Sequence, residues 1–138
     1  MSENTVKPGI IIADDSQTAR MIVKRCLELS GLVDAEFWEA GNGREALKHL
    51  KSNKIVLLIT DFNMPVMDGG ILLKWIKNSP QIKDTPVVVI TSAGNPAREK
   101  ELIGDGAYAV LSKPVSPALF MEKLEPLISK VLENMQKA

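Results

Sequence analysis

Short apolar runs alternate along the chain with segments whose apolar residues recur every three or four positions. Apolar runs bounded by turn residues are typical of buried strands, and the wider spacing is typical of helices packed by one face. The third and fourth runs are apolar throughout, as expected for parallel strands covered on both faces. The pattern predicts five strands, at residues 9–13, 34–39, 55–60, 86–91 and 107–111.

Polar residues at the expected helix starts indicate where four of five helices begin. Asn42, followed three residues later by Glu45, is a candidate cap for the second helix, and Asp68 is one for the third. Asn95 and Ser116 each precede a proline, which is favoured at the first helical position, so they are expected to begin the fourth and fifth helices.

The same spacing predicts which helix faces are apolar. Pro126 lies inside the fifth helix, where it removes one backbone donor, so we expect a kink or a shifted boundary there. The expected faces are Ala19, Ile22, Val23, Cys26 and Leu27 in the first helix, Ile71, Leu72, Trp75 and Ile76 in the third, and Phe120, Leu124, Leu127, Ile128 and Val131 in the fifth.

Five alternating strand and helix units predict an α/β fold, a doubly wound parallel sheet with helices on both faces in a three-layer sandwich. The length of 138 residues fits a single domain spanning 1–138. Folds of this kind bind ligands outside the carboxyl ends of their strands. Functional side chains are therefore expected at the strand ends.

Four of the five strand ends carry chemically active side chains. Taken singly, each has an ordinary explanation, as a helix cap, a turn residue or a strand residue. A parallel sheet brings its strand ends to one edge, however, so these residues are expected to lie close together. They are Asp14 and Asp15 after the first strand, Asp61 at the third, Thr91 at the fourth, and Lys113 before Pro114 after the fifth.

Three carboxylates at one edge repel one another unless a cation or a proton offsets their charge. An oxygen-rich cluster without cysteine or histidine suits Mg²⁺, which keeps several waters and binds together with phosphate. Lys113 can balance charge on a phosphoryl group, and the Thr91 hydroxyl can donate to one of its oxygens. These parts favour a carboxylate nucleophile that forms an acyl phosphate.

Composition excludes several other classes of function. The 17 basic and 17 acidic residues are scattered and cancel, which argues against nucleic-acid or membrane-surface binding. Cys26 cannot form an internal disulfide and is expected to be buried and unreactive, and the lone His49 is expected on a helix face away from the site. The longest apolar run, 55–59, is too short to span a bilayer, so a cytoplasmic protein is expected.

The segments IIADDS, ITDFNMPVMDG, VVVIT and LSKP together resemble the receiver domain of bacterial two-component response regulators, over essentially the whole chain. The resemblance implies a flavodoxin-like sheet with strand order 2-1-3-4-5 and a signalling role rather than an enzymatic one. It also implies roles for individual residues. These are Asp61 as the residue phosphorylated by a histidine kinase, Asp15 as a direct Mg²⁺ ligand, Asp14 as a ligand acting through water, Asn63 as a ligand through its backbone carbonyl, Thr91 as the switch hydroxyl, Lys113 as the phosphoryl contact, and Pro114 as the residue after a cis peptide.

The chain departs from the receiver pattern at the switch. Val110 stands where receivers usually carry Tyr or Phe, so the usual coupling between Thr91 and an aromatic ring is not expected. Strand alternation would place Tyr108 on the same face as Val110. Ala93 is small and apolar where some receivers carry a residue that assists the attacking water, so the phosphoryl group is expected not to be short-lived.

The leading hypothesis is a stand-alone receiver, since only 24 residues follow Pro114 and no output domain is expected. Its partner protein would bind at the fourth helix, fifth strand and fifth helix, where residues 98–101 offer a charged face. A chemotaxis-like regulator and a phosphorelay intermediate that passes its phosphoryl group to a histidine phosphotransferase both remain open. An aspartate-nucleophile phosphohydrolase is disfavoured, because Asn63 replaces the second acid that such enzymes need. A phosphorylation-independent interaction domain is disfavoured because the whole reactive set is present.

Overall fold

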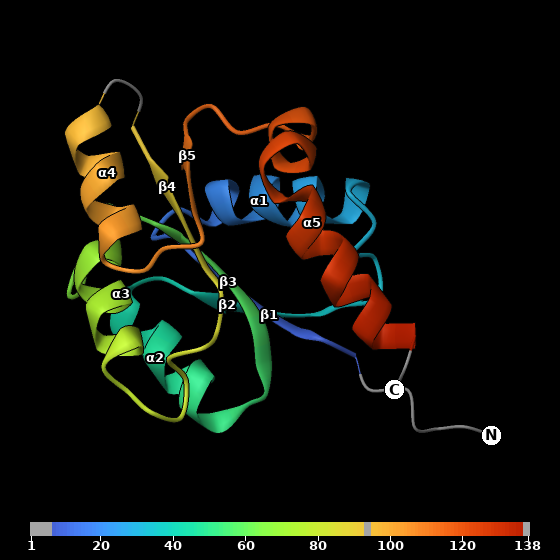
Figure 1. Cartoon of the computed structure of the whole chain (residues 1–138), viewed down its shortest axis with the longest axis horizontal. Coiled ribbons are helices and arrows are strands. Elements are labelled where there is room, and N and C mark those ends of the chain that lie inside the picture. The colour runs from blue at the N-terminus through green and yellow to red at the C-terminus, as the bar shows by residue number, and fades with distance from the viewer. Residues whose placement is uncertain (1–6, 93–94, 137–138) are drawn as a thin grey trace.

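The computed structural model describes residues 7–92 and 95–136, and within them five strands alternate with five helices (Figure 1). The strands are β1 (Gly9–Ala13), β2 (Glu36–Ala40), β3 (Ile55–Asp61), β4 (Val87–Thr91) and β5 (Ala109–Ser112). The helices are α1 (Gln17–Leu29), α2 (Gly43–Ser52), α3 (Gly69–Lys77), α4 (Pro96–Gly104) and α5 (Pro117–Gln136).

The strands form one parallel sheet in the order β2-β1-β3-β4-β5, which confirms the predicted topology. Helices α1 and α5 cover one face, and α2, α3 and α4 cover the other, so the molecule has three layers (Figure 1). The chain moves from β1 to one side for β2 and to the other side for β3. The strand order therefore reverses at β1 and β3, which is where a ligand site is expected in this fold.

Side-chain alternation along the central strands divides the core in two. Ile10 and Ile12 pack with the buried faces of α1 and α5, whereas Ile11 packs with those of α2, α3 and α4. The three isoleucines are all fully or almost fully buried. An apolar run without polar interruption is thus required, because both faces of β1 are covered.

The predicted caps are present. The side-chain oxygens of Asn42, Asp68, Asn95 and Ser116 each accept a hydrogen bond from the backbone N–H three residues further on. Pro126 lies inside α5, which continues beyond it to Gln136, so the helix boundary is not shifted at the proline. One missing backbone donor is tolerated because α5 is held to the core by the side chains around it.

The predicted apolar faces were only partly correct. Val23, Cys26 and Leu27 of α1 are buried, but Ile22 is 48% exposed, and Trp75 of α3 is 53% exposed. The spacing of apolar residues predicts a stripe on each helix that is wider than the area the sheet covers. Residues at the edge of this stripe therefore remain exposed to solvent. Burial raises the pKa of the Cys26 thiol, as expected for an unreactive core cysteine. Among the described residues, none of the helices combines the length and apolar character that crossing a bilayer requires.

The loop before α3 contains a residue with an unfavourable backbone conformation. Val66 has a φ of 69°, and its side chain is 75% exposed, so little packing compensates for the strain. A β-branched residue is especially disfavoured in the left-handed region, where asparagine and glycine are tolerated.

We expect Val66→Asn to raise the free energy of unfolding by about 1 kcal/mol, because a left-handed conformation costs roughly that much in an ordinary L-residue. Urea denaturation measures this change. Val33 is a matched control, since it is 64% exposed and its φ is not positive. Equal stabilisation by Val33→Asn would show that strain at Val66 is not the cause.

Candidate metal and phosphoryl site

The structure brings three carboxylates together at the carboxyl edge of the sheet. Asp14 and Asp15 follow β1, and Asp61 is the last residue of β3. Ala13 pairs with Thr60, so the residues that come next on these two strands lie at the same level. One oxygen from each of the three carboxylates lies within 4.8 Å of the others. Asp14 and Asp61 are buried, with 6% and 4% exposure, whereas Asp15 faces solvent.

Backbone contacts hold Asp14 in place. Its N–H donates to the Ala40 carbonyl at 2.9 Å, which extends the ladder between β1 and β2. Its carboxylate accepts from the Ser16 N–H at 2.9 Å, and its carbonyl accepts from Arg20 Nη1 at 2.6 Å. Arg20 is fixed in turn by Glu39 on β2, with 2.7 Å between Nε and Oε1. The first acid of the cluster is therefore preorganised before any ligand binds.

The electrostatics of this cluster are unfavourable without a ligand. Burial raises the pKa of Asp14, and the nearby charges of Asp61 and Asp15 raise it further, against the opposing effects of the Ser16 hydrogen bond and Lys113. Ionised Asp14 thus destabilises the folded state. The effect grows as the pH rises from the ordinary value of 3.8 through the raised value in the folded protein.

Lys113 provides the cation that the described residues place closest to Asp61. Its Nζ lies 2.8 Å from Asp61 Oδ1, and this bond is the main reason that the pKa of Lys113 is raised. Its backbone N–H donates to the Thr91 carbonyl at 2.9 Å, so the residue after β5 is anchored to the end of β4. The peptide bond between Lys113 and Pro114 is cis, as the resemblance to receiver domains implies.

The two predicted switch positions lie on neighbouring strands. Thr91 ends β4 and is 4% exposed. Val110 pairs with Val89, two residues before Thr91, and packs in the core on the side of α2, α3 and α4. Tyr108 lies just before β5, which begins at Ala109 instead of at residue 107 as predicted, and its N–H donates to the Val87 carbonyl at 2.8 Å. Ala93 lies outside the described residues.

The loop from Asp61 to α3 folds back onto the strand end. The Gly69 N–H donates to the Phe62 carbonyl at 2.8 Å, and a Cβ on Gly69 would lie 2.5 Å from the Asp61 carbonyl oxygen. Only glycine permits this close approach. Asn63, the predicted carbonyl ligand, lies exposed in this loop two residues after Asp61.

A contact that sequence reasoning missed joins this loop to α4. The Arg98 guanidinium lies 4.1 Å from the centre of the Phe62 ring, in a cation–π contact. Arg98 is consequently half-buried, whereas the sequence suggested that it belongs to an exposed charged face. Glu99, Lys100 and Glu101 are exposed as expected. Residues 62 and 98 are too far apart in the chain for any spacing rule to pair them.

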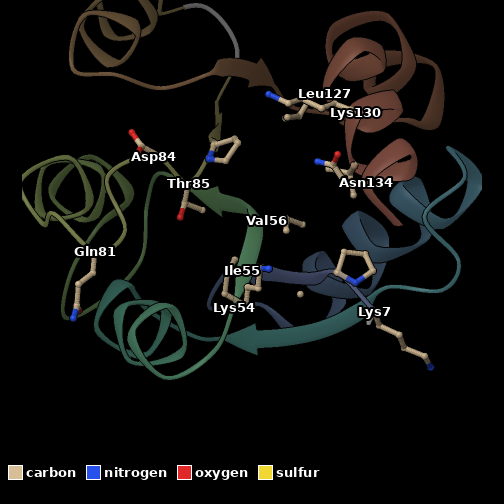
Figure 2. A pocket seen from close by; sticks show the side chains of 14 residues that line it. Lys7, Lys54, Ile55, Val56, Gln81, Asp84, Thr85, Leu127, Lys130 and Asn134 are labelled. Carbon is tan, nitrogen blue, oxygen red and sulfur yellow. The ribbon is translucent and has the colours of Figure 1, made fainter. Parts of the chain in front are cut away.

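The remaining candidates lie away from the site. His49 bonds the Glu39 carbonyl at 3.0 Å and packs beside Trp38, which confirms its place on a helix face. A pocket of about 430 Å³ lies where β3 begins at Ile55, whereas Asp61 ends that strand. Figure 2 shows this pocket with side chains from the start of β3, the loop before β4, and α5 around it. It is thus at the opposite edge of the sheet from the carboxylates.

The donor set fits Mg²⁺. Oxygen ligands, partial exposure and a net excess of negative charge are the features that a hard divalent cation requires. Asp14, Asp15 and Asp61 supply them within the range of one ion, and Asp15 leaves the site open to solvent.

Comparison with known proteins identifies relatives over most of the chain. Residues 10–125 match the model of the response regulator receiver domain. The chain is 35% identical over 120 residues to chemotaxis protein CheY1 of Helicobacter pylori, covering 86% of this chain and 95% of that protein. It is also 35% identical over 122 residues to two-component response regulator ORR3 of Oryza sativa subsp. indica, covering 86% of this chain and 91% of that protein. The chain belongs to the response regulator receiver family.

Solved structures show the same architecture. Chemotaxis response regulator CheY4 of Vibrio cholerae superposes with a TM-score of 0.76 at 30% identity, covering 88% of this chain and 99% of that one. The receiver domain of a signal transduction histidine kinase from Syntrophus aciditrophicus gives a TM-score of 0.74 at 28% identity, covering 95% and 94%. The flavodoxin-like order predicted for the sheet is thus the order found in CheY-like receivers.

We expect Asp14→Asn to stabilise the metal-free protein by about 1 kcal/mol at pH 7, because like charges roughly 4 Å apart repel by that much even in water. The gain should shrink towards zero below pH 3.8, where the carboxyl is protonated in both states. Urea denaturation without divalent ions at both pH values measures this. A gain of equal size at both would show that charge is not responsible.

Proposed function

We propose that Asp61 accepts a phosphoryl group from the phosphohistidine of a histidine kinase in a Mg²⁺-dependent reaction. One observation carries this proposal. Asp61 is a buried carboxylate that lies both within a three-acid cluster and 2.8 Å from the Lys113 ammonium. A purely structural ion pair would not need two further acids beside it, since they only add repulsion.

The proposed reaction is an in-line displacement. A carboxylate oxygen of Asp61 forms a bond to phosphorus while the bond from phosphorus to the imidazole nitrogen breaks, and its electron pair stays on that nitrogen. Lys113 balances charge on the phosphoryl oxygens, and the Thr91 hydroxyl donates to one of them.

The metal would be held by Asp14, Asp15, Asp61 and the Asn63 carbonyl. Bound Mg²⁺ would neutralise the negative charge shared by the carboxylates and the incoming phosphoryl group. The chain's own part is to hold these oxygens at one edge, which the anchoring of Asp14 by Ser16 and Arg20 supports.

Signalling would then proceed by phosphorylation-dependent protein binding at α4, β5 and α5. Exposed apolar side chains lie on these elements and beside them, at Ile103, Tyr108 and Met121. The Arg98 contact with Phe62 supports this surface, because it links α4 to the residue directly after the acceptor. A change at Asp61 can thereby shift the equilibrium between two arrangements of α4.

A chemotaxis-like role is our first choice, since curated relatives include chemotaxis proteins of Helicobacter pylori and Vibrio cholerae. One observation favours a phosphorelay intermediate as the second candidate. Val110 removes the usual aromatic switch, and a relay needs docking and transfer more than a large conformational change. Transfer of the phosphoryl group from Asp61 to a purified histidine phosphotransferase would distinguish the two.

The wild-type protein incubated with Mg²⁺ and acetyl phosphate should gain the mass of one phosphoryl group, read by intact-protein mass spectrometry. Chelation of Mg²⁺ should abolish the gain, since nothing then offsets the repulsion between phosphate and three carboxylates. Asp61→Asn should gain none and Asp68→Asn, which alters an acid that serves as a helix cap, should still gain it. Failure of wild type under conditions that label another receiver would refute the proposal.

A further inference from the structure

Positive charge is concentrated on two neighbouring helices. Helices α2 and α3 together carry five basic residues, Arg44, Lys48, Lys51, Lys74 and Lys77, against one acidic residue, Glu45. Helices α4 and α5 together carry four basic and five acidic residues. Since the whole chain has zero formal charge, the excess on α2 and α3 is local. The Glu45 carboxylate is engaged by the Gly41 N–H at 2.8 Å, so it is held at the start of α2.

The basic residues of α2 lie on its outer surface and, for Arg44 and Lys51, on the flank opposite His49. His49 lies on one flank of α2, where it packs beside Trp38 and bonds the Glu39 carbonyl, so this flank of α2 faces β2 at the edge of the sheet. Arg44, Lys48 and Lys51 are spaced i, i+4 and i+7 and therefore share the opposite flank and the outer surface. All three are exposed.

The facing flank of α3 is apolar and exposed. The side chain of Lys77 lies against Gly106, just beyond α4, so this side of α3 faces α4. Ile71 and Trp75 are spaced i and i+4 and lie on the other side, towards α2, with which α3 is in contact. They are 48% and 53% exposed. We call the six residues Arg44, Lys48, Lys51, Ile71, Lys74 and Trp75 the α2–α3 surface.

This surface has unused binding capacity. Tryptophan and arginine are the residue types enriched among the energetically dominant residues of protein interfaces, and the surface exposes Trp75 and Arg44. Within residues 7–92 and 95–136, no carboxylate pairs with Arg44, Lys48, Lys51 or Lys74. Charge and apolar area are thus both available to a partner on one side of the molecule.

The charge and the exposed apolar side chains of the α2–α3 surface favour one kind of binding partner. A membrane-surface helix needs a broad apolar face, but the apolar face of α3 formed by Leu72, Leu73 and Ile76 is buried in the core. A duplex-binding surface would be expected to extend its positive charge beyond two helices, but the rest of the chain carries 12 basic and 16 acidic residues and so has no positive excess to add. An acidic protein segment with an apolar anchor side chain matches both the cations and Trp75.

We propose that the α2–α3 surface docks an acidic segment of a partner protein, whose apolar side chain packs on Trp75 and Ile71. This docking goes beyond phosphorylation-dependent binding at α4, β5 and α5, because it uses other helices. It does not require a phosphoryl group on Asp61, so it brings a partner to the receiver in either state.

The test is a selection of random peptides displayed on phage against the full-length wild-type protein, with affinities then measured by fluorescence anisotropy. Enriched peptides should be acidic with an apolar residue, and their binding should weaken as salt increases. Trp75→Ala and Lys51→Glu should each weaken binding by about tenfold or more, the loss typical of a dominant interface residue. Met21→Ala and Lys24→Glu, at exposed positions of α1, are matched controls that should bind as wild type does.

Three outcomes would overturn the proposal. They are enrichment of peptides without acidic residues, peptides whose affinity is unchanged in a Trp75→Ala/Lys51→Glu double variant, and stronger Trp75-dependent binding to phosphatidylglycerol vesicles or duplex DNA than to any selected peptide. Circular dichroism and phosphorylation by acetyl phosphate would show that the variants remain folded. Because peptide binding needs no phosphorylation, its failure is distinguishable from failure of the phosphoryl-acceptor role.

Discussion

Repulsion among three carboxylates at one edge of the sheet is the constraint on which the other features of this molecule depend. Parallel pairing of β1 with β3 places Asp14 and Asp61 side by side in a largely buried position, and it leaves Asp15 in solvent beside them. Lys113 offsets part of that charge, at 2.8 Å from Asp61. The cluster therefore lowers the stability of the ligand-free protein, as functional sites commonly do, and under the proposed function it binds a cation and a phosphoryl group.

A short series of contacts connects the carboxylate cluster to the outer surface at α4. The usual receiver couples a threonine to an aromatic ring, but Val110 has no ring to move. Here an aromatic residue, Phe62, stands directly after Asp61, and the Arg98 guanidinium lies 4.1 Å from its ring centre. Such a contact is worth about 0.5–1 kcal/mol at a partly exposed site, which under the proposed function is enough to bias two arrangements of α4 but not to lock one.

Local chemistry made much of the structure predictable. The apolar runs predicted the central strands. The helix starts were predictable because a cap depends only on neighbours in the chain, as at Asn42, Asp68, Asn95 and Ser116. The carboxylates could be placed together because parallel strand ends meet at one edge. Three-dimensional neighbours were not predictable: periodicity cannot show that Ile22 and Trp75 lie beyond the covered stripe, that Arg98 reaches Phe62, or that Tyr108 lies outside β5.

The central claim is that Asp61, and no other carboxylate of the cluster, forms the acyl phosphate. Reduction of a phosphorylated aspartate by sodium borohydride converts that residue to homoserine, which peptide mass spectrometry locates. After treatment with Mg²⁺, acetyl phosphate and borohydride, the account predicts homoserine at position 61 and aspartate at positions 14 and 15. Homoserine at either of those positions, or unmodified Asp61 in protein that has gained a phosphoryl group, would contradict it.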